Sequence, residues 1–197
     1  MGKGTNLPFS PSQNPPKYFL EHIHVDSTGK FDRPGPHRER RFAVVTDGYT
    51  GWKEVIIMQT LDQLPDRLQR LLEALQAKFP KNKIRFLHSD HGGENDNKRM
   101  AAWCLRHGID QLWSCPHTPE QNGTAERTVR TVKDRACTVM AHVKGPGVLW
   151  VEAVQYVTWI SNYLPVKGKD KTPFEAVWGR KPDVSNLRVW GLSLIHI

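Results

Sequence analysis

The sequence is poor in cysteine, and its three cysteines are not spaced to bind a metal. Cys104, Cys115 and Cys137 are odd in number and contain no Cys-x-x-Cys pair. We therefore expect neither a disulfide framework nor a structural zinc site. We interpret the thiols as reduced and mostly packed side chains of an intracellular protein.

Long apolar runs are also missing. No stretch approaches the roughly 20 residues that a membrane-spanning helix requires, and residues 1–16 lack the apolar segment of a secretory signal. Residue 6 is Asn, where N-myristoylation requires Ser or Thr. We expect no membrane segment, no secretory leader and no N-terminal myristoylation.

Acidic residues are outnumbered by basic ones. The chain has 28 Lys and Arg against 20 Asp and Glu, a net charge of +8 and an isoelectric point near 9.5. This balance favours a polyanionic partner, nucleic acid first. With 197 residues, the chain can form one domain with a real core. Residues 1–17 hold four of the fourteen prolines and little apolar periodicity, which predicts a flexible N-terminal arm.

Hydrophobic periodicity predicts strands first and helices later. Residues 18–26, 41–47 and 53–58 indicate strands, the last two joined as a hairpin. Further along, leucines recur at intervals of three and four, which is the helical period. The remaining predicted elements are helix 62–79, strand 84–90, helix 96–108, strand 109–115, helices 123–143 and 149–164, and a short helix with a turn at 172–182. Antiparallel strands followed by βαβ units predict an α/β fold with a mixed sheet.

Three carboxylates stand where such a sheet places functional groups. Asp26 ends the first predicted strand, Asp90 ends the fourth, and Glu126 lies on the first turn of helix 123–143. Functional groups gather beyond the carboxyl ends of strands in open α/β sheets. Clustered carboxylates repel one another unless a cation is bound. Mg²⁺ prefers oxygen ligands, and two such ions can clamp the attacking and leaving oxygens of a phosphodiester.

The helix that carries Glu126 also carries cations on the same flank. Arg130 and Lys133 follow Glu126 at i+4 and i+7, which places all three on one side of the helix. Cations beside a metal site can hold phosphates, and such contacts provide affinity and register. The simpler interpretation, a solvated helix flank, stays open.

Three segments resemble the catalytic motifs of the retroviral-type integrase core, in the form found in copia-type LTR retrotransposon Pol polyproteins. They are HVDSTGKF at 24–31, LHSDHGGEN at 87–95 and HTPEQNGTAERTVRTVKDRA at 117–136. The interval of 35 residues between Asp90 and Glu126 belongs to the same pattern. The similarity covers about residues 18–191, whereas residues 192–197 do not continue it and form an atypical or truncated tail.

The resemblance implies a ribonuclease H-like fold with a five-stranded mixed sheet flanked by helices. It implies an integrase catalytic core, an endonuclease and polynucleotidyl transferase that processes 3′ ends and inserts element cDNA into target DNA. By the same resemblance, Asp26, Asp90 and Glu126 match the catalytic triad that binds two Mg²⁺ or Mn²⁺ ions. It further implies a homo-oligomer, at least a dimer, that acts in the nucleus after a cytoplasmic particle stage. Asn122, Arg130 and Lys133 match positions that contact DNA.

Several alternatives stay open at this point. Asp47 precedes a turn and rivals Asp26 as the strand-end carboxylate. His22 and His24 share strand parity with Asp26, although we expect them to be partly buried or surface side chains.

Two of the matched motifs depart from the family pattern at individual positions. Two functions other than integration also stay open. His91, Asn95 and Glu120 replace the residues usual at their positions. A catalytically impaired nucleic-acid-binding or assembly module, or a ribonuclease H-like nuclease, would share the fold. Helix-spaced aromatic residues indicate core or a subunit interface: Trp150, Tyr156, Trp159 and Trp178.

Overall fold

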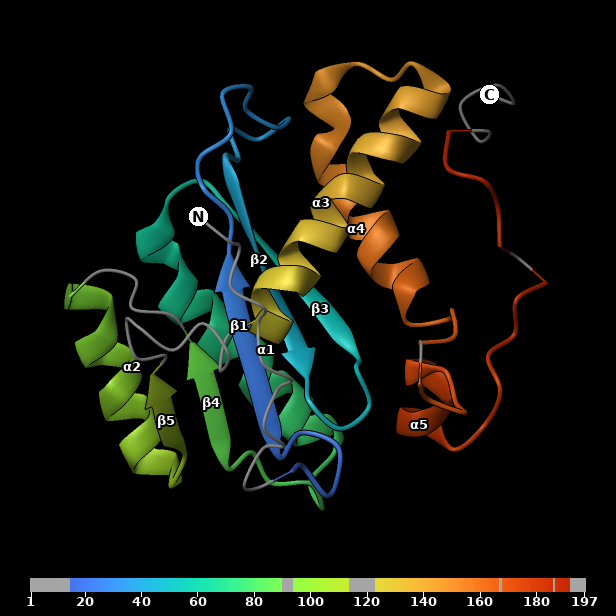
Figure 1. Ribbon diagram of the computed structural model, residues 1–197. Coiled ribbons are helices and arrows are strands. Elements are labelled where there is room, and N and C mark those ends of the chain that lie inside the picture. The colour runs from blue at the N-terminus through green and yellow to red at the C-terminus, as the bar shows by residue number, and fades with distance from the viewer. Residues whose placement is uncertain (1–14, 90–93, 114–122, 167, 186, 192–197) are drawn as a thin grey trace, which may run out of the picture.

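The computed structural model describes residues 15–89, 94–113, 123–166, 168–185 and 187–191. Its centre is a five-stranded sheet of order β3-β2-β1-β4-β5 (Figure 1). The first three strands pair antiparallel, whereas β4 and β5 run parallel to β1. The predicted mixed sheet is confirmed. Its strands are β1 His22–Ser27, β2 Arg41–Asp47, β3 Lys53–Met58, β4 Phe86–Ser89 and β5 Asp110–Trp113.

Helices cover both faces of the sheet. Helices α1 and α2 pack together on one face, and α3 and α4 pack together on the other (Figure 1). Short 3-10 helices at Leu61–Gln63 and Gly147–Leu149 lead into α1 and α4. The helices are α1 Leu64–Lys78, α2 Glu94–His107, α3 Gly123–Val143, α4 Trp150–Ser161 and α5 Pro173–Trp178.

Strand alternation divides the apolar side chains into two cores. Ile23 and Val25 face α1 and α2, whereas the neighbouring strand turns Phe42 and Val44 toward α3 and α4. All four are at most 2% exposed. Burying side chains of this size contributes about 1.5–3 kcal/mol each. The second core, which includes Val129, Val132 and Ala136, holds α3 on β1 and β2.

Some element boundaries differ from the predicted ones. The first strand begins at His22 instead of residue 18, because Leu20 adopts φ +74 and its N–H donates to Asp47. The predicted end of the second helix is confirmed. Gly108 has φ +65, its N–H donates to Leu105, and the next N–H donates to Cys104. This pair of bonds is a Schellman cap.

The side chains flagged from the sequence have mixed environments. Cys104 is buried, but Cys137 is exposed, so the expectation of packed thiols is wrong for Cys137; Cys115 lies outside the described residues. Trp150 is buried in the second core, whereas Trp159 and Trp178 are 44% and 37% exposed. Across the described part of the chain, no helix combines the length and apolar character needed to cross a membrane.

Candidate functional site

Asp26 lies at the carboxyl end of β1, on the sheet face covered by α3. Its side chain is half-buried, and its Oδ1 accepts the N–H of Ser27 at 2.8 Å. The parallel partner β4 places Ser89 beside Val25. The strand residues that precede Asp26 and Asp90 in the sequence are therefore neighbours. Asp90 itself lies outside the described residues.

Glu126 lies on the first turn of α3, which packs on β1 and β2 (Figure 1). Ala125 and Val129 are buried against the sheet, which leaves Glu126 pointing outward with 65% of its side chain exposed. The Arg130 guanidinium lies 3.4 Å from its Oε1. An exposed i,i+4 pair of this kind contributes little stability. The fold therefore depends little on the Glu126 side chain.

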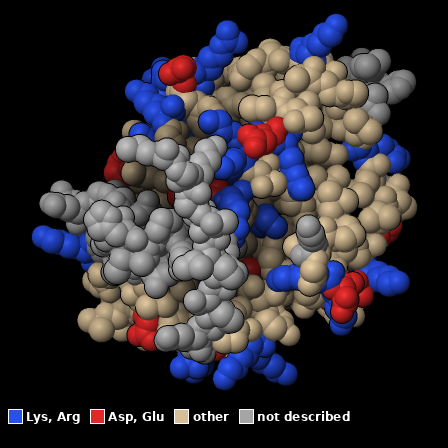
Figure 2. Space-filling model, viewed as in Figure 1, with Lys and Arg blue, Asp and Glu red and all other residues tan. Residues whose placement is uncertain are grey.

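On the predicted basic flank of α3, Arg130 and Lys133 are both exposed. Arg130 contacts Glu126, and the Lys133 ammonium lies 5.7 Å from the Phe31 ring. Figure 2 shows Lys and Arg side chains gathered in the middle of this face, with few acidic ones among them. Asn122 lies outside the described residues. Contact of these side chains with DNA stays a prediction.

Asp47 has a structural role instead. It is 3% exposed, and its Oδ1 accepts the N–H of Leu20 at 2.8 Å. Its Oδ2 accepts both the N–H and the hydroxyl of Thr50 at 2.6 Å. Burial raises the pKa of Asp47, and the Thr50 bonds oppose that shift. Because β2 opposes β1 and pairs Asp47 with Ile23, Asp47 lies at the other end of the sheet from Asp26.

A layer of three histidines lies on the same sheet face as Asp26. The His24 and His88 rings stack with centroids 4.3 Å apart, and His22 Nδ1 lies 3.3 Å from His88 Nε2. Burial is the main reason that the pKa of His24 falls to about 3 and that of His88 to about 4. The pKa of His22 is also lowered by burial. All three imidazoles are therefore neutral near pH 7.

Sequence reasoning did not single out His88. The proximity of His24 and His88 depends on the register between the parallel strands β1 and β4, which pairs the two residues directly. The sequence alone does not give this register. Among the residues the structure describes, no group of three or more His, Cys, Asp or Glu side chains is placed to hold a metal ion. The predicted carboxylate set includes Asp90, which is outside that part of the chain.

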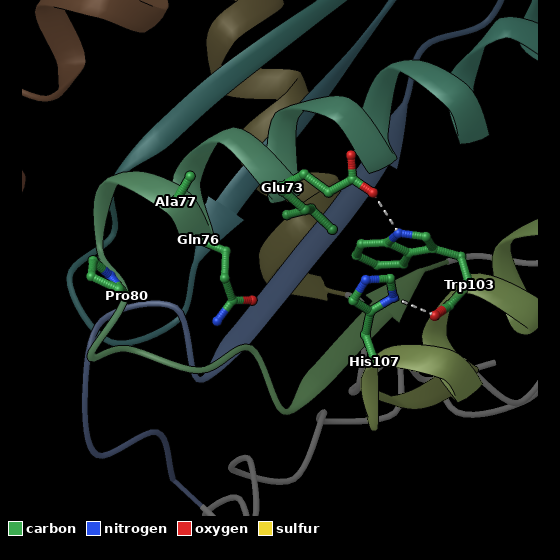
Figure 3. A pocket seen from close by; sticks show the side chains of 7 residues that line it. Glu73, Gln76, Ala77, Pro80, Trp103 and His107 are labelled. Atoms are coloured by element: carbon green, nitrogen blue, oxygen red, sulfur yellow. Dashed lines mark hydrogen bonds between the residues drawn. The ribbon is translucent and has the colours of Figure 1, made fainter.

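A surface cavity of about 280 Å³ lies between α1 and α2, on the sheet face opposite Asp26 (Figure 3). Within it, Trp103 Nε1 donates to Glu73 Oε1 at 2.9 Å, and His107 Nδ1 lies 2.9 Å from the Trp103 carbonyl oxygen. These polar groups thus find their hydrogen-bond partners within the cavity wall. The cavity is lined by Leu72, Glu73, Gln76, Ala77, Pro80, Trp103 and His107.

A family model and curated proteins give consistent matches to this chain. The family model described as "Integrase core domain" matches residues 20–119. The retrovirus-related Pol polyprotein from transposon TNT 1-94 of Nicotiana tabacum is 29% identical over 191 residues, which are 96% of this chain and 14% of that protein. The corresponding polyprotein from transposon RE1 of Arabidopsis thaliana is 28% identical over 198 residues, 98% of this chain and 13% of that protein.

A solved structure matches the fold. It is a chain in the cryoEM structure of the simian T-cell lymphotropic virus intasome in complex with PP2A regulatory subunit B56 gamma. The TM-score is 0.64 at 16% identity, covering 91% of this chain and 64% of that one. The mixed sheet with helices on both faces is thus a ribonuclease H-like α/β fold, as the sequence predicted.

Proposed function

Because the chain belongs to the integrase core domain family of retrotransposon and retroviral Pol proteins, we propose that it is a polynucleotidyl transferase for DNA integration. The observation that supports this proposal is the placement of two carboxylates. Asp26 lies one residue before the end of β1, and Glu126 lies on the first turn of α3, which packs on that same strand. Residues 18–191 would form the catalytic core, with 1–17 as an arm and 192–197 as an atypical tail.

The proposed chemistry is two successive displacements at phosphorus. First, a water oxygen bonds to a phosphorus near the 3′ end of the element DNA, and the P–O3′ bond breaks. The new 3′-hydroxyl oxygen then bonds to a phosphorus of the target strand, whose own P–O3′ bond breaks. Each step exchanges one P–O bond for another, and the proton of the attacking hydroxyl ends on the leaving oxygen through solvent. No covalent enzyme intermediate is needed.

Asp26, Asp90 and Glu126 would hold two Mg²⁺ or Mn²⁺ ions. The donors fit, because Asp26 and Glu126 offer hard carboxylate oxygens on rigid elements, and one of them is solvent-accessible. When bound, the ions would stabilise negative charge on the attacking and leaving oxygens. The chain's own task is to hold the carboxylates together against their mutual repulsion.

The partners would be the DNA ends of the element and a target duplex. Arg130 and Lys133 are exposed cations beside Glu126, suited to phosphate contacts; we assign Asn122 the same role from its motif. The protein would work as a dimer or larger homo-oligomer, in the nucleus after a cytoplasmic particle stage. The chain spans only 13–14% of the length of its curated relatives.

Strand joining, or its reversal on a branched oligonucleotide, tests the proposal. The wild type is compared with Glu126→Gln and with Glu73→Gln, which alters an exposed α1 carboxylate on the other face of the sheet. The control keeps an amide oxygen that can still accept the Trp103 Nε1–H. We expect joining with Mg²⁺ or Mn²⁺ in the wild type and in Glu73→Gln. We expect none in Glu126→Gln or with EDTA.

Two other results would overturn the transferase. DNA binding without joining, identical in all three proteins, would indicate a binding or assembly module. Metal-dependent cleavage of an RNA–DNA hybrid without joining would indicate a ribonuclease H-like nuclease.

A further inference from the structure

Three cations converge at the end of the sheet that lies away from Asp26. They come from three separate parts of the chain: Lys53 begins β3, Arg135 lies in α3, and Lys169 follows α4. We call Lys53, Arg135 and Lys169 the distal basic cluster. None of the three belongs to the candidate catalytic site.

Hydrogen bonds connect the cluster to the turn between β2 and β3. The Lys53 ammonium donates to the Gly51 carbonyl at 2.9 Å, and the Lys169 ammonium donates to the Tyr49 carbonyl at 2.5 Å. A Cβ built on Gly51 would lie 3.6 Å from the Lys169 ammonium. Both ammonium groups therefore occupy the same small region of the turn.

The end of α4 attaches Arg135 to the same region. Arg135 donates to the Ser161 hydroxyl at 3.3 Å. The next residue, Asn162, is 3% exposed, and its side chain bonds both the N–H and the carbonyl of Lys53 at 2.8 Å. This pair of hydrogen bonds fixes the position of Lys53 at the start of its strand. The cluster is thus held by the fold and is not a set of unrelated surface lysines.

The cluster has an excess of positive charge. Among described residues, no carboxylate forms an ion pair with any of its members. Asp47 is close enough to interact with Lys169, but its oxygens already accept bonds from Leu20 and Thr50. Burial first, and then the charges of Arg135 and Lys169, lower the pKa of Lys53 to about 8. A bound anion would relieve this repulsion.

The cluster lies on the other flank of α3 from the predicted DNA-contacting residues. Arg135 follows Glu126 by nine residues, which is half a turn out of phase at about 100° per residue. Arg130 and Lys133 stay within about 40° of Glu126 by the same count. A duplex held only at the catalytic flank would therefore leave Arg135 unused.

We propose that the distal basic cluster binds a backbone phosphate of DNA at a second position, remote from the catalytic carboxylates. Ammonium and guanidinium donors around one small region suit the oxygens of a phosphodiester. The inference rests on the proposed function, since it assumes that DNA is the polyanion. Such a contact supplies affinity and orientation and carries no sequence preference.

Salt-dependent DNA binding tests the cluster. The double variant Arg135→Gln/Lys169→Gln removes two exposed cations and leaves Ser161 bonded to Val157. The matched control Arg70→Gln/Lys83→Gln removes two exposed cations elsewhere. A fluorescent duplex is titrated at several salt concentrations, and melting curves verify folding. We expect the slope of log K against log salt to become shallower by about two in the double variant only.

Each remaining outcome has a distinct meaning. A slope equal to wild type in the double variant overturns the second DNA contact. Stabilisation of the wild type but not the double variant by inorganic phosphate, with that unchanged slope, would identify a free-anion site and overturn the DNA assignment. Joining is measured in parallel. If the wild type does not join DNA but the salt slope of the double variant is shallower, the transferase proposal is wrong and the DNA contact at the distal basic cluster is supported. If the wild type joins DNA but the slope is unchanged in the double variant, only the DNA contact at the cluster is wrong.

Discussion

Asp26 and Asp47 each stand at or near the end of a strand, but β1 and β2 are antiparallel, so the two carboxylates lie at opposite ends of the sheet. At one end, Asp26 is half-buried on β1, which contacts α3 and pairs with β4. At the other, Asp47 is enclosed by hydrogen bonds that shape the turn before β3. Two aspartates near strand ends thus have different surroundings because their strands run in opposite directions.

The difference extends to the charges around each carboxylate. On the sheet face that carries Asp26, the first turn of α3 presents the exposed Glu126, whereas Lys169 of the distal basic cluster interacts with Asp47. We have proposed metal ions for the Asp26 end and a DNA phosphate for the other end. The three predictions that follow test this contrast, beginning with the largest expected effect.

Exchanging each aspartate for asparagine should separate activity from stability. Asp26→Asn keeps an Oδ1 to accept the Ser27 N–H, so we expect normal folding. Joining should fall by more than about 100-fold, because even outer partners of metal ligands cost 10–100-fold. Asp47→Asn replaces an acceptor of buried N–H and O–H groups with a donor, which should cost about 1–3 kcal/mol of unfolding free energy.

Joining assays and urea denaturation measure the two effects on the same preparations. The contrast fails if Asp47→Asn is as stable as wild type. It also fails if Asp26→Asn joins DNA normally.

The histidine layer should make the fold sensitive to mild acid. The folded pKa values of His24 and His88, about 3 and about 4, lie below the unfolded value near 6.5. Below about pH 6.5 the unfolded chain takes up protons that the folded chain does not. The free energy of unfolding therefore decreases as the pH is lowered. We expect a loss of roughly 2 kcal/mol between about pH 6.5 and 5.5, from two histidines.

Urea denaturation across this range measures the loss, and His88→Gln should reduce the pH slope by about half. An unfolding free energy that stays constant from neutral pH to about pH 5 would contradict neutral buried imidazoles.

We expect the smallest effect from a substitution at Arg130, on the flank of α3 that carries Glu126. Arg130 is exposed and pairs only weakly with Glu126, so Arg130→Gln should leave stability unchanged within about 0.5 kcal/mol. DNA binding should weaken a few-fold, and the salt slope should become shallower by about one. Anisotropy titrations beside Arg70→Gln measure this. If the salt slope of Arg130→Gln equals that of Arg70→Gln, Arg130 does not contact DNA and is an ordinary solvated side chain.

Periodicity and turn chemistry were sufficient to predict much of the fold. The long helix at 123–143 was predicted with its observed bounds, because its apolar stripe is continuous. The strand at 18–26 was misplaced, since the alternation of its residues conceals the turn at Leu20. That turn depends on a bond to Asp47, a residue distant in sequence, and no local pattern reveals it.

The site could be predicted only as far as motifs and helix phase reach. Spacing alone placed Arg130 beside Glu126, and the structure confirms that contact. The stacking of His24 on His88 depends on which strands become neighbours in the sheet. The convergence of Lys53 and Arg135 depends on how α4 ends against β3. Such long-range arrangements follow from packing, which the linear pattern does not contain.

Asn162 has a consequence for how copies of this chain meet. β3 is an edge strand, and an edge strand with unpaired backbone groups can recruit a strand from another molecule. The Asn162 amide takes both backbone groups of Lys53, much as a residue of a sixth strand would. A neighbouring chain would have to displace this buried side chain before it could extend the sheet there. The edge beside Lys53 is thereby protected from uncontrolled strand pairing and aggregation.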